Sequence, residues 1–332
     1  MEVTRVGGVN VVRIPFDGYV GRGDPPNAYF IAAKPLVLID TGIMYPGNLG
    51  RLAAALETFD FTLSEIDLVV LTHWHWDHTG LAREIADRSG ARFFCHSSER
   101  VRLFGNDDEV GELAASTRRF YASHGFDRGL AASLTGLAFD HERVDIPFER
   151  VHFVRGGEKV PAGALALQVL HTPGHTPGAL CLFSDEDKAL FSSDTVYGRL
   201  FPHPVVEIPS KGDRTRSVLR EYPATLRKLG KLGAMTCFPG HGAPFSPAQK
   251  VIAPISSFIE RRLKRLERLL AVHPLCAADV MTAFFPNVSE AERYHAVAEV
   301  VLLLEVLEIE GRAERTEEHG ILKFMKSDKG VP

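Results

Sequence analysis

The sequence has few cysteines, and no two of them lie close together along the chain. Cys95, Cys181, Cys237 and Cys276 are widely spaced and form no CxxC pair among the 332 residues. This spacing argues against a disulfide framework and against a cysteine-type zinc site, because both patterns cluster their cysteines. Free thiols in a reducing cytoplasm are the expected state.

Long apolar runs and a strong net charge are also missing. The longest apolar candidate, VVLLLEVLEIE near 300–310, is interrupted by Glu305 and is shorter than the roughly 20 residues that a membrane helix needs. The first residues, MEVTRVGGVNVVRIPF, do not combine a basic segment with an apolar run as a signal peptide does. A formal net charge of −4 gives no overall attraction to nucleic acid or to a membrane. We therefore expect a cytoplasmic protein without a membrane partner.

The composition is that of an ordinary globular protein, with 45% hydrophobic and 24% charged residues. The first half of the chain reads as strands and short helices in alternation. Strands are predicted at 9–16, 27–33, 36–40, 66–72, 91–96, 164–172, 178–184, 188–194 and 234–240. Helices are predicted at 48–59, 79–90 and 216–230, and Pro223 is expected to kink or split the last of them.

Two segments depart from this alternation. Residues 97–150 are rich in Arg, Ser, Asp and Phe and mostly helical in pattern, so they are predicted to form an insertion or lid. From 247 onward the sequence predicts a long helix, two further helices and a hairpin over 312–326, which is the order of a winged helix. The predicted division is a main domain over 1–246, with the insertion at 97–150, and a C-terminal domain over 247–332.

The stretch LTHWHWDHTG, residues 71–80, concentrates side chains that bind metals. Four residues of ligand type occupy six positions: His73, His75, Asp77 and His78. At the end of a strand, the first two histidines project from the same face and can both reach one cation. The two tryptophans of the stretch, Trp74 and Trp76, are expected to alternate to the other side and to wedge the segment against the core.

Three further residues of ligand type each follow an apolar strand, with Gly or Pro beside them. They are His175 in HTPGHTPG, Asp194 at the end of LFSSD and His241 in CFPGHG. Strand ends can aim side chains into one cleft while loops supply the bends. Imidazoles suit Zn²⁺ or Fe, and carboxylate oxygens join them readily, so the sequence predicts a metal site with ligands for two neighbouring ions.

The motifs HWHWDH, TPGHTPG, SSDT and FPGHG resemble, in their order, the motifs of the metallo-β-lactamase superfamily over roughly residues 5–245. The resemblance implies an α/β fold, an αββα sandwich of two packed sheets with helices outside and a dinuclear metal site at one edge. It makes 1–246 the catalytic domain. By motif position, one metal is bound by His73, His75 and His175. The other is bound by Asp77, His78 and His241, and Asp194 bridges the two.

The segment VLIDTG resembles a further recurring strand of the family. This resemblance places Asp40 near the site, behind the ligands. On the sequence alone, a turn-forming cap before Gly42 is the alternative role for Asp40.

Two divalent metal ions are the cofactors that this ligand set implies, Zn²⁺ first, with Fe or Mn as alternatives. Two cations about 3.5–4 Å apart share a water and lower its pKa to about 7, so a bridging hydroxide becomes the nucleophile. Asp77 is expected to orient this hydroxide and to shuttle a proton. The sequence has no GxSxG elbow, which agrees with activated water rather than a serine as nucleophile.

The presence of Asp194 favours some reactions of the family over others. True β-lactamases of the superfamily usually lack this carboxylate and are secreted, whereas the full ligand set resembles the glyoxalase II and lactonase type. The leading hypothesis is therefore hydrolysis of an ester, thioester or lactone in a small-molecule acyl substrate. One alternative is a metal-dependent single-strand endoribonuclease with the same ligands. Another is a mononuclear iron persulfide dioxygenase, against which the retained Asp77, His78 and His241 argue.

Candidate substrate residues follow from position and aromatic character. Tyr197 stands three residues after Asp194 and resembles a tyrosine of acyl-homoserine lactonases that faces the substrate carbonyl, with simple packing as the alternative. The other candidate pocket residues are Phe120, Tyr121, Phe201 and His203. For the aromatic residues, a small core within the lid is the alternative.

Residues 247–332 resemble, in organisation, the winged-helix tail of the β-lactamase-like protein 2 group. One helix face carries the basic residues Arg261, Lys264, Arg265 and Arg268. They are interpreted either as phosphate contacts or as a solvated face beside Glu260 and Glu267. The predicted wing carries Glu314, Glu317 and Glu318, and an acidic wing is a poor clamp for DNA. We therefore expect a lid, a packing module or a homodimer contact, with nucleic-acid binding as the alternative.

Overall fold

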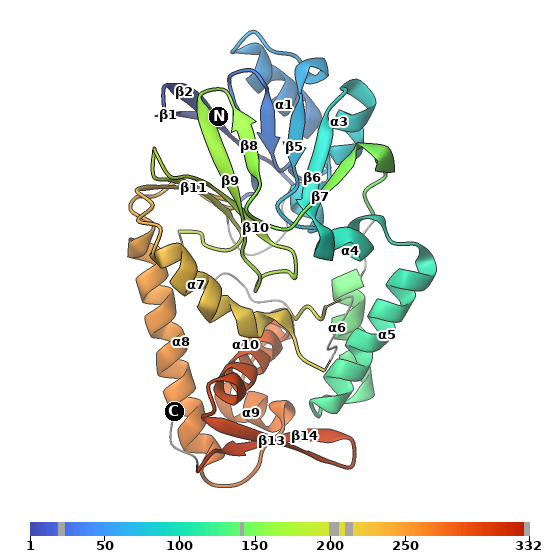
Figure 1. The fold of residues 1–332 in the computed structure, drawn as a ribbon. Coiled ribbons are helices and arrows are strands. Elements are labelled where there is room, and N and C mark those ends of the chain that lie inside the picture. Colours follow the sequence, from blue (N-terminus) through green and yellow to red (C-terminus); the bar gives the residue numbers. More distant parts are fainter. Residues whose placement is uncertain (19–23, 140–142, 199–205, 210–214, 329–332) are drawn as a thin grey trace.

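The computed structural model of the protein describes residues 1–18, 24–139, 143–198, 206–209 and 215–328. Two β-sheets lie in one half of the molecule, and helices with a small hairpin fill the other half (Figure 1). In spatial order, the larger sheet contains β1 (Glu2–Val6), β2 (Val9–Pro15), β3 (Asn27–Ile31), β4 (Val37–Ile39), β5 (Leu68–Val70), β6 (Arg92–His96) and β7 (Val151–Val154). The smaller sheet contains β12 (Thr236–Pro239), β11 (Ala189–Ser193), β10 (Leu180–Ser184), β9 (Leu165–His171) and β8 (Lys159–Ala162).

Every strand that the sequence predicted is present, with ends that differ by a few residues. The sequence did not predict β1, β7 or β8, and each of these is the last strand at one edge of its sheet. Their burial is partial, whereas all five residues of β3, β10 and β11 are buried. Edge strands bury less apolar surface, so their sequences carry a weaker hydrophobic pattern.

Some helices cover the outer faces of the sheets, and others form the insertion and the C-terminal part of the chain. They are α1 (Asn48–Glu57), α2 (Trp76–Thr79), α3 (Ala82–Arg88), α4 (Arg100–Phe104), α5 (Asp107–Ser123), α6 (Arg128–Phe139), α7 (Tyr222–Gly230), α8 (Gln249–Leu270), α9 (Ala277–Phe284) and α10 (Glu290–Ile309). Short 3₁₀ helices cover Leu63–Glu65, Ser97–Glu99, Phe148–Arg150 and Val218–Glu221. Among the described residues, no helix is both long and apolar enough to cross a membrane.

Three apolar layers hold the sandwich together. Between the sheets, Ile31 of β3 belongs to the same core as Phe191 of β11. On the outside of the larger sheet, Leu52 of α1 and Ile85 of α3 belong to the core that includes Phe93 of β6. On the outside of the smaller sheet, side chains of α7 and α8 share a core with β10 and β11. Helices thus cover both outer faces, which confirms the predicted αββα arrangement.

Proline and apolar spacing explain how the helices near the smaller sheet begin and pack. Pro223 lies in the first turn of α7, where its missing N–H costs no helical hydrogen bond. The predicted helix over 216–230 is therefore split into the 3₁₀ helix Val218–Glu221 and α7. In α8, side chains spaced three or four apart face the core: Ile252, Ile255, Ile259, Leu263, Leu266 and Leu270.

The insertion packs against the C-terminal helices. Phe120 of α5 and Leu134 of α6 lie in one apolar core with Leu263 of α8. The backbone N–H of Ala278 in α9 donates to the carbonyl of His124, just after α5 (3.2 Å). Residues 97–150 are therefore joined to the segment after 247 by a shared core.

The predicted order of three helices and a hairpin is present after residue 247, with β13 (Ala313–Glu318) and β14 (Ile321–Lys326) as the hairpin. Glu305, the charged residue that interrupts the apolar run of α10, is 1% exposed. Its carboxylate accepts hydrogen bonds from the N–H (2.7 Å) and the hydroxyl (2.6 Å) of Ser217. The winged-helix assignment and the domain division at 246 stay predictions.

Candidate metal centre

The motif LTHWHWDHTG begins after β5 and runs into α2. Because β5 ends at Val70 and α2 begins at Trp76, the histidines 73 and 75 stand on a loop and not on the predicted strand. Trp74 is buried, and the guanidinium of Arg102 lies over its ring, 4.4 Å from the ring centre. Trp76 is 40% exposed. The predicted wedge role therefore fits Trp74 and is wrong for Trp76, since strand alternation does not continue into a loop and a helix.

This difference predicts unequal effects of two similar substitutions. Trp74→Ala should lower the free energy of unfolding by about 3–5 kcal/mol and weaken metal retention, because it empties a buried site between two ligands. Trp76→Ala should change the free energy of unfolding by less than about 0.5 kcal/mol. Denaturant unfolding and metal content of both variants measure this. Equal destabilisation by the two substitutions would contradict the assignment.

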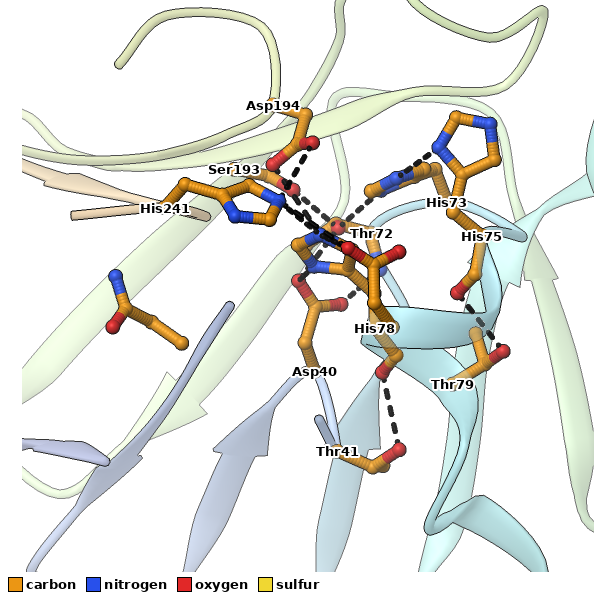
Figure 2. A network of polar contacts seen from close by, with 12 residues as sticks. Asp40, Thr41, Thr72, His73, His75, His78, Thr79, Ser193, Asp194 and His241 are labelled. Atoms are coloured by element: carbon orange, nitrogen blue, oxygen red, sulfur yellow. Dashed lines mark hydrogen bonds and ion pairs between the residues drawn. The ribbon is translucent and has the colours of Figure 1, made fainter. Parts of the chain in front are cut away.

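The structure brings together every residue that the sequence predicted as a metal ligand. Figure 2 labels five of them: His73, His75, His78, Asp194 and His241. One set, here called the three-histidine group, consists of His73, His75 and His175. In it, His75 Nδ1 lies 3.0 Å from His73 Nε2 and 2.9 Å from His175 Nε2. A second set, the aspartate–histidine group, consists of Asp77, His78 and His241. In it, His241 Nε2 lies 3.3 Å from His78 Nε2 and 3.4 Å from Asp77 Oδ2.

Asp194 lies between the two groups. Its Oδ2 is 3.6 Å from Nε2 of His175 and 3.3 Å from Nε2 of His241. Its Oδ1 is 3.4 Å from Nε2 of His78. One carboxylate therefore faces both ligand sets, which is the position that a bridging ligand requires.

Burial and charge divide the histidines into two kinds. Burial lowers the pKa of His73 and of His75 well below the usual value, and that of His175 to about 4. Burial also opposes protonation of His241, but Asp194 and then Asp77 outweigh it and raise the pKa of His241 to about 10. The same two carboxylates raise the pKa of His78 well above its usual value. Neutral imidazoles in the three-histidine group offer lone pairs to a cation at once, whereas the other group must first release protons.

The surroundings of these residues fit a metal centre. Ring nitrogens of three imidazoles converge at hydrogen-bonding distance, although neutral imidazoles cannot all donate to one another. Burial favours protonation of Asp194, but the facing His241 and His78 hold its pKa well below the usual value, so it stays a carboxylate. A Cβ atom on Gly240 would lie 2.0 Å from Asp194 Oδ1, so only glycine leaves room for this carboxylate. Convergent imidazole and carboxylate donors form the ligand type that suits Zn²⁺ or Fe.

Asp40 lies directly behind the aspartate–histidine group. Its Oδ1 accepts the backbone N–H of Thr72 (2.8 Å), and its Oδ2 accepts the Thr72 hydroxyl (2.8 Å) and faces His78 Nδ1 (2.9 Å). Asp40 has a φ of 58° and Ser193 a φ of 44°, and the Ser193 hydroxyl lies 2.6 Å from that of Thr72. Such left-handed backbone is costly outside glycine and gathers at functional sites. Asp40 thus orients His78, as a hydrogen-bonded carboxylate behind a ligand does.

One buried carboxylate that the sequence did not predict lies next to the three-histidine group. Glu99 ends the 3₁₀ helix Ser97–Glu99 and has no exposed surface. It accepts the N–H of Trp74 (3.0 Å) and, in a shorter contact, the N–H of Gly178. Burial and the nearby Glu207 raise its pKa to about 8. Its sequence context, HSSER, carries no signal for this role.

The candidate substrate residues are not all near the ligands. The half-buried Tyr197 lies beside the aspartate–histidine group, its ring centre 5.8 Å from that of His241. The structure does not bring Phe120 and Tyr121 to the metal centre. Both are almost completely buried in a core shared with the C-terminal helices, which is larger than the small core within the lid that the alternative predicted. Phe201 and His203 lie outside the described residues.

Several proteins of known sequence are similar to this chain over most of its length. "Probable metallo-hydrolase YqjP" of Bacillus subtilis (strain 168) is 28% identical over 306 residues, covering 91% of this chain and 92% of that protein. "Beta-lactamase-like protein 2 homolog" of Caenorhabditis elegans is 25% identical over 282 residues, covering 84% and 76%. "Thioesterase pkgB" of Emericella nidulans is 27% identical over 248 residues, covering 74% of this chain and 54% of that protein.

A solved structure and a family model extend the comparison. A beta-lactamase domain protein from Burkholderia ambifaria has the same fold, with a TM-score of 0.75 at 21% identity, covering 98% of this chain and 94% of that chain. The family model described as "Metallo-beta-lactamase superfamily" matches residues 21–241, a range that contains every predicted metal ligand. The chain therefore belongs to the metallo-β-lactamase superfamily and is a metal-dependent hydrolase of that family.

Proposed function

We propose that this protein is a dinuclear hydrolase that cleaves an ester, thioester or lactone bond in a small acyl substrate. The observation that carries the proposal is the convergence of two ligand groups on Asp194. Seven donors arranged as two sets are more than a single ion requires. The same excess argues against the mononuclear iron dioxygenase.

The proposed chemistry assigns separate tasks to the side chains. Two divalent ions, Zn²⁺ in this proposal, would supply an activated water at neutral pH and polarise the scissile carbonyl. The carboxylate of Asp77 would accept a hydrogen bond from the attacking water and take up its proton. The hydroxyl of Tyr197, beside His241, would donate to the substrate carbonyl oxygen and stabilise the charge that develops there.

Two observations favour an acyl substrate over single-stranded RNA. A relative that aligns with 74% of this chain is named a thioesterase. Of the basic residues on α8, Lys264 pairs with Glu260 (3.8 Å), and the guanidinium of Arg265 lies 4.3 Å from the ring centre of Phe284. These contacts support the interpretation of the basic residues of α8 as a solvated face whose side chains contact neighbouring residues. A homodimer and a cytoplasmic location stay predictions.

The test is a substrate panel on the zinc-loaded protein, with Tyr197→Phe as the variant. Acyl thioesters and lactones of several chain lengths should be hydrolysed, while single-stranded RNA stays intact. Tyr197→Phe should lower kcat by about 10²-fold and retain both ions, because it removes one donor to the developing oxyanion. RNA cleavage with untouched thioesters and lactones would replace the proposal by the endoribonuclease. An unchanged kcat with lower stability would assign Tyr197 to packing.

A further inference from the structure

We propose that Glu99 is a positioning residue that ties together the two loops of the three-histidine group and thereby sets the affinity of the ion held there. The inference rests on the dinuclear centre of the proposed function and is independent of the substrate. It concerns a residue of the predicted insertion that is not a ligand itself.

The geometry of the carboxylate supports this role. Glu99 Oε2 accepts the backbone N–H of Trp74, the residue between His73 and His75 (3.0 Å). Glu99 Oε1 accepts the N–H of Gly178, three residues after His175. Each oxygen therefore fixes one of the two loops that supply the three-histidine group, and the loops are about 100 residues apart in the chain.

Both loops pack closely around the Glu99 carboxylate. A Cβ atom on Gly178 would lie 2.6 Å from Glu99 Oε1 and 2.9 Å from His96 Cβ, so the close approach of the loop requires glycine. On the other loop, the ring of Trp74 lies under the guanidinium of Arg102 (4.4 Å). Because Glu99 is fully buried, water cannot replace either hydrogen bond when the carboxylate is lost.

Glu99 supports only one of the two ligand groups. Asp40 contacts His78 of the aspartate–histidine group directly and reaches His73 only through the Thr72 hydroxyl, which lies 3.1 Å from His73 Nδ1. Within the described residues, Glu99 makes no hydrogen bond to any ligand of that group. Loss of Glu99 should therefore weaken one ion and spare the other. A general loss of stability would not have this selectivity.

The test compares Glu99→Gln with Glu305→Gln. Both substitutions keep the size of a buried carboxylate side chain and replace one acceptor oxygen by an amide nitrogen. Glu305 also accepts a backbone N–H and a hydroxyl, but on α10, where its partner is Ser217. Chelator competition on protein loaded with two equivalents of Zn²⁺ measures both affinities. Cadmium NMR, with its separate resonances for the two sites, identifies which ion changes.

Glu99→Gln is expected to weaken one ion by about 10–100-fold, the range for residues that support a metal ligand, and to alter only the cadmium resonance of the three-histidine group. Glu305→Gln should leave both affinities and both resonances unchanged. Equal affinities in the two variants, or equal weakening of both ions by Glu99→Gln, would overturn the inference. A wild-type protein that binds fewer than two ions would instead contradict the proposed function.

A second variant decides the question where Glu99→Gln does not fold. Gly178→Ala leaves the carboxylate in place and pushes the loop away from it, because the added Cβ lies too close to Oε1. The same selective loss of the ion of the three-histidine group is expected. Retention of both ions at wild-type affinity in Gly178→Ala would overturn the inference.

Discussion

Replacing Asp77 by alanine is expected to lower kcat for thioester or lactone hydrolysis by about 10²–10⁴-fold, the range for loss of a positioned proton acceptor. Asp77 Oδ2 lies 3.4 Å from His241 Nε2 and 3.8 Å from His78 Nε2, so its carboxylate belongs to the ligand set. In the proposed function it also accepts the proton of the attacking water. Alanine removes both contributions. Steady-state kinetics and metal content of the same sample measure them together.

Two further variants separate this effect from a general loss of charge. Asp77→Asn keeps the size of the side chain and should lose activity to a similar extent, because the amide is a poor proton acceptor. Asp87→Ala removes an exposed carboxylate of α3 that pairs with Arg83 (2.8 Å). Such surface pairs contribute little, so kcat should be unchanged. Wild-type kcat in Asp77→Ala would exclude Asp77 from the reaction.

Removal of the metal ions is expected to abolish hydrolysis and to lower the thermal midpoint by roughly 10 °C. Ions that bind only the folded state stabilise it by about 2.7 kcal/mol each at a hundredfold excess over Kd. Two ions contribute about 5.4 kcal/mol. A long chain lies at the lower end of the usual range, about 2 °C per kcal/mol, which gives a shift of about 10 °C. Differential scanning calorimetry with and without a chelator measures the shift, and added Zn²⁺ should restore it. A midpoint unchanged by the chelator would contradict a built metal centre.

The same experiment has a predictable pH dependence. The pKa values of His78 and His241 are raised, that of His241 to about 10. Protonation of these two residues therefore stabilises the metal-free protein, fully at a pH below their ordinary pKa. This stabilisation is lost as the pH rises toward 10. Metal binding must displace these protons. The metal-induced increase of the midpoint should therefore grow between about pH 6 and about pH 9. His73, His75 and His175 have lowered pKa values and add no such dependence in this range. An equal metal-induced increase of the midpoint at about pH 6 and at about pH 9 would contradict the raised pKa values of His78 and His241.

The metal ligands could be predicted from the sequence because the information is local. HWHWDH holds four of them within six positions, and the remaining three each follow a strong apolar strand beside glycine or proline. Strand ends of two stacked sheets meet at one edge, so local signals add up to a three-dimensional arrangement. The same locality explains the error at Trp76. The apolar run IDLVVLT predicted a strand to residue 72, but β5 ends at Val70, and side-chain alternation ends with it.

The features that the sequence did not reveal depend on partners distant in the chain. Glu99 bonds to residues 25 and 79 positions away, and nothing in its neighbourhood distinguishes it from a surface glutamate. Phe120 and Tyr121 belong to an amphipathic helix, and such a pattern indicates burial without saying against what. Their partners are on helices that follow more than 100 residues later. An apolar pocket and an apolar core are built from the same types of residue, so only the tertiary structure distinguishes one from the other.

The core shared by α5, α6 and α8 has a consequence for how such proteins diversify. Two segments separated by the strands of the second sheet form a single packing unit, since each provides the surface that covers the other's apolar face. A chimaera that takes residues 97–150 from one relative and 247–332 from another would join unmatched surfaces and leave cavities or clashes. Recombination and laboratory evolution of this scaffold should therefore succeed when both segments come from the same parent.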